Sequence, residues 1–474
     1  HGNICLSNIF DGGSPNSESA MLGECLCAPG GYAQPILYET IERAFASPVA
    51  KREVAFSDDI YALGVVLALL VAPHDCTEGM SQEEILMHKL ELGTFNLMTS
   101  RDRLPGQIIE MLRGMLDEDP NNRWTIWEVK ETLEGRRVTG KQSGKSIPKS
   151  SRPIEFIKRK FFRPDVFAVH LPKEPSLVTQ MVDNGDIYMW LNRSLQSKPY
   201  EERYERAVEQ AKKNSSTSNF ADRVSAFIAA AMAPGFPIFY KGMAFSPAGV
   251  GNLLADAIAN RKDINPFLEI LSGDLVSFWA QCKSSAGQVV VEDISKFETC
   301  RMYLLQKHVG FGIERCLYFL SPYLHCMSDK LLAYHVRSSS DLLRALEQLA
   351  QQGKNRPSWF VDRHILAFLY THDKSVVESN SADFNATEKF RQVIAVLKTF
   401  AKIQARDKMG PLPNLSTWIG EHTEDMVNRF HDREMRKKVK ADLEKLKSKG
   451  DLTSMAQLFN NQEEMQNDMR LFVQ

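Results

Sequence analysis

Cysteine and histidine are the residue types of this chain best suited to binding a metal, but their spacing does not form a recognisable site. The eight cysteines are scattered over 474 residues. Neither Cys25-Leu26-Cys27 nor His325-Cys326 is accompanied by a second ligand pair at the spacing of a zinc ribbon or a zinc finger. The simpler interpretation is a set of free, mostly buried thiols in a reducing compartment.

The triplet Gly144-Lys145-Ser146 ends like a phosphate-binding loop. That motif requires a glycine at the position where this chain has Thr139, and it also requires a preceding strand, of which the sequence shows no sign. The triplet lies in a basic stretch rich in glycine and serine. We therefore interpret residues 136–152 as a basic linker and as the clearest domain boundary in the chain.

The global charge excludes a strong attraction to nucleic acid or to a charged membrane surface. The chain has 58 basic and 59 acidic side chains, for a net charge of -1. No apolar run approaches the roughly 20 residues needed to cross a bilayer, and the longest, Ala62 to Ala72, suits a buried helix. The chain opens at His1 with neither a methionine nor a signal peptide, so we expect an N-terminal truncation and a cytoplasmic location.

The spacing of apolar residues predicts a mainly α-helical chain. A hydrophobic fraction of 43% in 474 residues is enough for at least two cores. The run from Ile60 to Val71 has no strand-like alternation, and apolar residues recur every three or four positions elsewhere. The segments predicted to be helical by this pattern are Ile108–Leu116, Glu128–Leu133, Tyr204–Ala211, Phe220–Met232 and Leu342–Gln351.

Beyond the linker, three sequence blocks recur in the same order and predict an internal repeat. We assign the first copy to residues 153–232, and the second copy with further helices to 233–420. Each copy predicts a short extended pair, a helix that starts with proline, and a helix led by Gly-Asp. We interpret Trp190 and Trp279 as core anchors in equivalent holes. The matched blocks are Pro153–Phe156, Phe162–Pro164 and Gly185–Trp190, then Pro237–Tyr240, Phe245–Pro247 and Gly273–Trp279.

The final segment, residues 421–474, is predicted to form a charged amphipathic helix and a tail. Apolar residues recur at roughly helical spacing between Glu421 and Lys449. The basic centre, Arg436 to Lys440, has acidic residues nearby and favours a solvated face. A partner helix or a coiled-coil contact is the alternative.

Three segments resemble protein-kinase motifs and occur in kinase order. The segment His1–Asn8 has the spacing of the catalytic loop, in which an aspartate is followed five residues later by an asparagine. The segment Ser57–Val65 resembles the signature of kinase helix F, and Met115–Thr125 resembles the Asp-Pro-x-x-Arg-x-Thr segment that closes the C-lobe. The resemblance implies a kinase-like C-lobe over residues 1–135, with the N-lobe missing from the chain.

The chain is more specifically similar to bacterial proteins of the Ser/Thr kinase superfamily that place a long helical region after a degenerate kinase domain. The segments Leu22–Cys25, Gly312–Leu317 and Val361–His364 resemble that family. The structural kinase positions implied by the resemblance are His1, Asp59, Gly64 and Arg123. Among these, Asp59 is implied to anchor the backbone of the catalytic loop.

The resemblance also implies that the catalytic positions are degenerate. Asn3 stands where the catalytic aspartate belongs, and an amide can hydrogen-bond a hydroxyl group but cannot take up its proton at neutral pH. Asn8 matches the metal-binding asparagine. Glu24 aligns with the magnesium-binding aspartate, although the glycine of that motif is missing.

The end of the activation segment departs from the kinase pattern as well. The segment Gly31–Ile36 resembles its closing motif, but Ile36 replaces the glutamate that pairs in kinases with the arginine matched by Arg123. Arg123 therefore needs another partner, and Glu39 or Glu42 is predicted.

These features favour a pseudokinase that regulates or scaffolds through protein–protein binding. The alternative is an atypical active Ser/Thr kinase that uses Glu24 for magnesium and relies on positioning for transfer. No cofactor is firmly implied, because ATP and Mg²⁺ would require a competent N-lobe. Unrelated chemistry in the helical half is least favoured, since the sequence there shows no Ser-His-Asp order, metal cluster or dinucleotide fingerprint.

Overall fold

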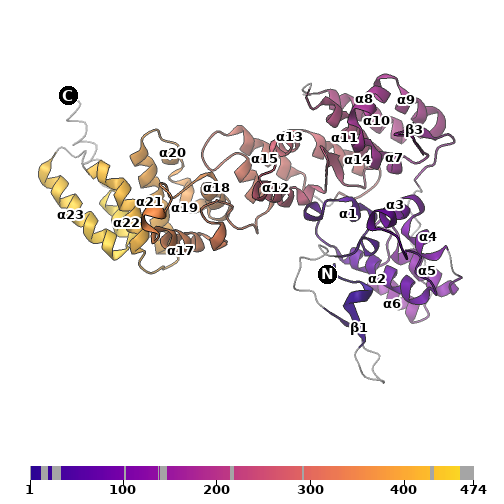
Figure 1. Cartoon of the computed structure of the whole chain (residues 1–474), viewed down its shortest axis with the longest axis horizontal. Coiled ribbons are helices and arrows are strands. Elements are labelled where there is room, and N and C mark those ends of the chain that lie inside the picture. Colours follow the sequence, from indigo (N-terminus) through magenta and orange to yellow (C-terminus); the bar gives the residue numbers. More distant parts are fainter. Residues whose placement is uncertain are drawn as a thin grey trace. The chain divides into compact units, whose positions relative to one another are not determined.

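The computed structural model describes residues 2–11, 20–23, 34–100, 103–136, 138, 147–213, 218–290, 293–427 and 432–459. Within these residues the chain is mainly helical, as predicted, and its strands form three two-stranded antiparallel hairpins (Figure 1). The chain divides into an N-terminal unit of residues 1–256 and 263–295 and a C-terminal unit of residues 257–262 and 296–474. No helix in the described ranges has the length and hydropathy that a membrane span requires.

The N-terminal unit begins with a helical part, residues 34–136, preceded by a short hairpin. The apolar run near Ile60 forms α2, which packs against α5 around Tyr61, Val65 and Leu112. The two helices approach closely at Gly64, where an added Cβ would lie 2.9 Å from Cβ of Met115. The elements of this part are β1 Ile9–Asp11, β2 Ala20–Leu22, α1 Ile41–Phe45, α2 Phe56–Val71, α3 Gln82–Leu92, α4 Thr94–Thr99, α5 Gly106–Met115 and α6 Ile126–Leu133.

Two further hairpins follow in the same unit, and each leads into helices. We call residues 150–195 the first hairpin motif and residues 235–285 the second hairpin motif. The first contains β3 Ile154–Phe156, β4 Arg159–Phe161, α7 Pro164–His170, α8 Pro175–Asp183, α9 Asp186–Met189 and the π-helical turn Trp190–Leu195. Between the motifs lie α10 Lys198–Lys212 and α11 Phe220–Met232. The second contains β5 Ile238–Tyr240, β6 Met243–Phe245, α12 Val250–Ala259, α13 Asn265–Ser272 and α14 Leu275–Ser285.

The strands of the two hairpin motifs pair in the same register. Ile154 is opposite Phe161 in one motif, and Ile238 is opposite Phe245 in the other. Both connections have two residues with positive φ, which are Ile157-Lys158 (48° and 58°) and Lys241-Gly242 (47° and 75°). This is the backbone of a type I′ turn, whose twist matches that of the flanking strands.

Each hairpin motif buries a tryptophan against the start of its own hairpin. Nε1 of Trp190 donates to the carbonyl oxygen of Arg152 at 3.0 Å, and Nε1 of Trp279 donates to that of Phe236 at 2.8 Å. Arg152 and Phe236 both precede the proline that leads into the hairpin. The exposed fractions of Trp190 and Trp279 are 5% and 2%, so the prediction that both rings lie in the core is confirmed.

The C-terminal unit has helices and no strands among its described residues, and its core contains Phe360, Phe368, Phe400 and Trp418. Its helices are α15 Ser295–Leu305, α16 Ile313–Leu320, α17 Ser339–Ala350, α18 Arg363–His372, α19 Lys374–Glu378, α20 Ser381–Phe384, α21 Lys389–Arg406, α22 Pro413–Val427, α23 Arg433–Lys449 and α24 Leu452–Leu458.

The prediction of one amphipathic helix over residues 421–449 is wrong. α22 ends at Val427, and α23 begins at Arg433 after Asp432, whose carboxylate accepts from the backbone N–H of Glu434 at 2.9 Å. An aspartate at this position satisfies an otherwise unpaired helix-start N–H group and so favours a new helix. α23 packs on α22, and its basic side chains at 437, 438 and 440 are exposed as a solvated face.

Candidate functional site

The loop from Gly2 to Asn8 is tied to the start of α2. The backbone N–H of Gly2 donates to Oδ1 of Asp59 at 2.8 Å, which is the kind of contact that the kinase resemblance implies for Asp59. Within the loop, Nδ2 of Asn8 donates to the carbonyl oxygen of Asn3 at 2.9 Å. The structure thus brings Asn3, Asn8 and Asp59 together, while His1 lies outside the described residues.

The polar side chains of this loop are the amides of Asn3 and Asn8, the thiol of Cys5 and the hydroxyl of Ser7, with Sγ of Cys5 and Oγ of Ser7 3.2 Å apart. The side-chain nitrogen Nδ2 of Asn8 is directed at Asn3, and its side-chain oxygen Oδ1 faces Gly23. A Cβ added to Gly23 would lie only 2.6 Å from Oδ1 of Asn8. Glu24 and the following residues through Ala33 lie outside the described residues. The described ranges contain no group of three or more His, Cys, Asp or Glu arranged to hold a metal ion.

Arg123 is buried and pairs differently from the prediction. Its guanidinium lies 3.6 Å from Oδ1 of Asp58 and donates to the carbonyl oxygens of Ser57 and Asp117, each at 2.9 Å. Glu39 instead pairs with Lys51, and Glu42 pairs with Arg52. The prediction of Glu39 or Glu42 is therefore wrong, because Asp58 in the first turn of α2 lies nearer to Arg123 than either glutamate.

Arg52 completes the ion cluster at the start of α2. Its guanidinium donates to both carboxylate oxygens of Asp58, at 2.6 and 2.9 Å, and it also pairs with Glu42. Burial is the largest single effect on the pKa of Asp58, and it raises that pKa. The hydrogen bonds and ion pairs together outweigh burial and hold the pKa of Asp58 below its usual value. Asp58 is thus a charged structural group that joins two arginines from distant parts of the sequence.

A second buried charge, Lys89 on α3, was missed by the sequence analysis. Its ammonium group is fully buried and donates to the carbonyl oxygens of Ile36 at 2.9 Å, Leu37 at 3.0 Å and Glu39. Burial lowers the pKa of Lys89 to about 8, although Glu118 and Glu39 act to raise it. The available signal was the position of Lys89 on the apolar stripe of α3, beside Ile85, Leu86 and Leu90.

Lys89 belongs to a closed cluster around the ring of Tyr61. The charged groups of Lys89 and Arg123 each lie 5.1 Å from the centre of that ring. The Tyr61 hydroxyl is 2.6 Å from Oγ1 of Thr94, and the backbone N–H of Thr94 donates to Glu118 at 3.1 Å. Burial raises the pKa of both Tyr61 and Glu118. Because the cluster is buried, its role is to hold the chain after Pro35 in place.

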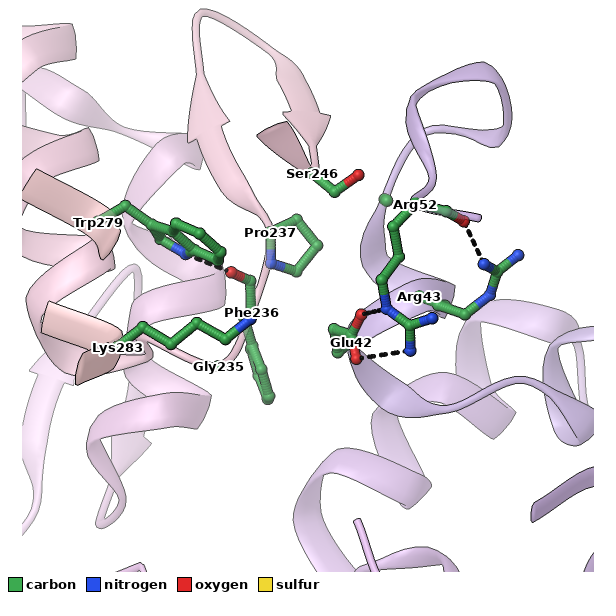
Figure 2. A pocket seen from close by; sticks show the side chains of 10 residues that line it. Glu42, Arg43, Arg52, Gly235, Phe236, Pro237, Ser246, Trp279 and Lys283 are labelled. Atoms are coloured by element: carbon green, nitrogen blue, oxygen red, sulfur yellow. Dashed lines mark hydrogen bonds and ion pairs between the residues drawn. The ribbon is translucent and has the colours of Figure 1, made fainter. Parts of the chain in front are cut away.

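A narrow cavity lies between the helical part and the second hairpin motif. Figure 2 shows Trp279, Lys283 and Pro237 on one side and Arg52, Arg43 and Glu42 on the other. Its volume of about 10 Å³ accommodates about one water molecule. It is therefore a packed contact and not a ligand pocket.

The first hairpin motif carries a much larger open groove of about 610 Å³. Its apolar lining includes Leu177, Met181, Met189 and Trp190, and its rim carries three basic side chains. This volume lies in the range of small-ligand and peptide sites.

The six cysteines in the described residues, Cys5, Cys76, Cys282, Cys300, Cys316 and Cys326, are free and buried, as the sequence predicted. No family model matches the chain, and comparisons with curated proteins and with solved structures give no match either. The class of this protein must therefore be argued from its own residues.

Proposed function

We propose that residues 1–135 form a protein-kinase-like C-lobe without phosphoryl-transfer activity, and that the protein regulates or scaffolds by binding other proteins. The observation that carries this proposal is the loop from Gly2 to Asn8. Its backbone is anchored by Asp59 and by the Asn8–Asn3 hydrogen bond. In the resemblance to kinases, the amide of Asn3 takes the position of the proton acceptor.

The chemical argument concerns the proton of the substrate hydroxyl. In a protein kinase, the catalytic-loop aspartate accepts that proton while the phosphoryl group moves from ATP to the hydroxyl oxygen. The amide of Asn3 has no basic site at neutral pH and can only hydrogen-bond the hydroxyl. A lobe that keeps the anchored loop but lacks the base is suited to presenting a surface.

The alternative, an atypical active Ser/Thr kinase, is favoured by one feature. Asn8 keeps the side chain that binds the second metal ion in kinases, and Glu24 supplies a carboxylate sixteen positions later in the sequence. Positioning and charge stabilisation alone account for much of phosphoryl-transfer catalysis. An activity measurement therefore decides between the two functions.

The test is incubation of the purified full-length protein with radiolabelled ATP, Mg²⁺ and generic Ser/Thr substrates. We expect no labelling of the protein or of the substrates, and none by an Asn3→Asp variant, because the base is only one of the altered positions. Robust transfer by the wild-type protein that is abolished by Glu24→Gln would overturn the proposal and establish Glu24 as a working metal ligand.

A further inference from the structure

The second hairpin motif is already covered, beside Trp279, by a segment of the same N-terminal unit. This segment, residues 45–50, begins at Phe45, the last residue of α1. The ring of Phe45 stacks on Phe236 with centroids 5.7 Å apart and meets Phe239 edge-on at 6.5 Å. The second hairpin motif therefore uses this face to receive an aromatic side chain.

The backbone of the same segment is bound to the hairpin. The N–H of Ser47 donates to the carbonyl oxygen of Ala244 at 2.8 Å, and the N–H of Ser246 donates to that of Ala50 at 3.0 Å. Contact is so close that a Cβ added to Gly249 would lie 2.1 Å from the Ala50 carbonyl oxygen. Side-chain stacking and main-chain hydrogen bonds together define a docking surface, part of which is seen in Figure 2.

The first hairpin motif leaves the corresponding side-chain face open, but its outer strand edge differs. At Phe162, the position that corresponds to Ser246, the carbonyl oxygen already accepts from the N–H of Ser150 at 2.8 Å, and the groove is lined by β3 and the turn after it, without β4. When the two hairpins are aligned, Arg152 corresponds to Phe236, Pro153 to Pro237 and Trp190 to Trp279. The first member of each pair lines the groove of the first motif, and the second member lines the narrow cavity beside the second motif. The difference is that an arginine replaces the phenylalanine on which Phe45 stacks. The groove therefore suits a partner with different chemistry from residues 45–50.

The charges around the groove indicate what that chemistry is. Arg152, Lys158 and Arg193 line it and are exposed, and among the described residues none of them forms an ion pair. Of the two acidic residues in the lining, Glu155 pairs with Lys160 at 3.4 Å, which leaves Asp186. The rim therefore carries an excess of positive charge above an apolar floor.

We propose that this groove binds a partner protein segment in which apolar side chains are flanked by acidic residues. This inference rests on the proposed binding function and specifies its partner. The flexible side chains of Met181 and Met189 adapt to apolar anchors of different shape, and the basic rim selects negative charge around them. In the second hairpin motif the positions that correspond to Arg152 and Glu155 hold Phe236 and Phe239, and both of these rings contact Phe45.

The experiment uses the full chain and a phage-displayed library of random peptides. Selection is run on the wild-type protein and on the charge-reversed variant Arg152→Glu/Arg193→Glu, whose changed side chains are exposed. The indole N–H of Trp190 donates to the main-chain carbonyl oxygen of Arg152, so this hydrogen bond is retained in Arg152→Glu. A matched control, Lys437→Glu/Lys438→Glu, makes the same charge change on the exposed face of α23.

We expect the wild-type protein to enrich peptides with clustered apolar residues and net negative charge. Synthetic copies of these peptides, measured by fluorescence polarisation, should bind the charge-reversed variant at least about tenfold more weakly, and the control variant should bind as the wild type does. The affinity should also fall with added salt, because the rim charges are exposed.

Enrichment of basic peptides, equal affinity for the charge-reversed variant, or no enrichment at all would overturn the proposal. Self-association of the wild-type chain in sedimentation, lost in Arg152→Glu/Arg193→Glu, would instead identify a second copy as the occupant and would also overturn it. Peptide binding is measured without ATP. A negative binding result is therefore distinguishable from the detection of phosphoryl transfer, which would refute the proposed function.

Discussion

Replacement of Lys89 by methionine tests whether a single buried lysine holds the chain from Ile36 to Glu39. Methionine keeps the unbranched shape and the apolar stem of lysine but has no donor. The substitution leaves three carbonyl oxygens, those of Ile36, Leu37 and Glu39, without the ammonium group that they share.

The size of the effect follows from two opposing contributions. Each lost hydrogen bond to a charged donor costs about 1.5–2 kcal/mol, or about 4.5–6 kcal/mol for the three. Against this, burial lowers the pKa of Lys89 from 10.5 to about 8, so removal of the charge relieves roughly 3 kcal/mol. This pKa already includes the attraction of Lys89 to Glu118 and Glu39. We expect a net local destabilisation of about 1.5–3 kcal/mol.

Hydrogen–deuterium exchange measures this loss at the segment concerned, because a chain of two compact units does not unfold as a single two-state system. Exchange of amides in peptides covering residues 34–45 should become roughly 10- to 150-fold faster in Lys89→Met, at tenfold per 1.4 kcal/mol. The control is Lys437→Met on α23, whose side chain is 62% exposed, and it should leave exchange in both units unchanged.

An unchanged exchange rate over residues 34–45 in Lys89→Met would refute the reasoning. It would mean that the three carbonyl oxygens are satisfied in another way, and that Lys89 contributes no more than its apolar stem. Faster exchange in both units alike would also refute a local role.

Three further predictions follow from the same contacts. The pKa of Lys89 is about 8 in the folded chain and 10.5 for an ordinary lysine, so the unfolded chain binds more protons between these pH values. The stability of the wild type relative to Lys89→Met should therefore rise as pH increases from about 8 to 10.5. A difference in the urea midpoint of the N-terminal unit that stays constant with pH would contradict this. Asp59→Ala removes the acceptor of the Gly2 N–H and should destabilise the loop by about 1–3 kcal/mol without creating or removing phosphoryl transfer, and an unchanged thermal midpoint would count against it. Trp190→Ala and Trp279→Ala should each cost about 3–5 kcal/mol, measured from the urea transition of the N-terminal unit, and a loss below 1 kcal/mol in either would argue against its place in the core.

The sequence predicted the features that depend on neighbouring residues. Apolar spacing located α2, α5 and α11, because one buried face requires a repeat near 3.6 residues. The hairpins at 154–161 and 238–245 and the burial of both tryptophans were also predicted. The resemblance to kinases indicated that Asn3, Asn8 and Asp59 belong to one site, and the hydrogen bonds of the loop bring them together.

The tertiary structure decided the features that depend on residues far apart in the chain. Arg123 has Asp58 beside it, 65 positions earlier in the sequence, and Lys89 reaches carbonyl oxygens about 50 positions away. Carbonyl acceptors are present at every residue, so no side-chain pattern identifies which ones a buried lysine will meet. The same holds for the contact between residues 45–50 and the second hairpin motif, where Ser246 bonds to Ala50 across 196 positions. Such pairings are fixed only when whole elements pack, because a buried charge takes whichever partner the packed core places within hydrogen-bonding distance.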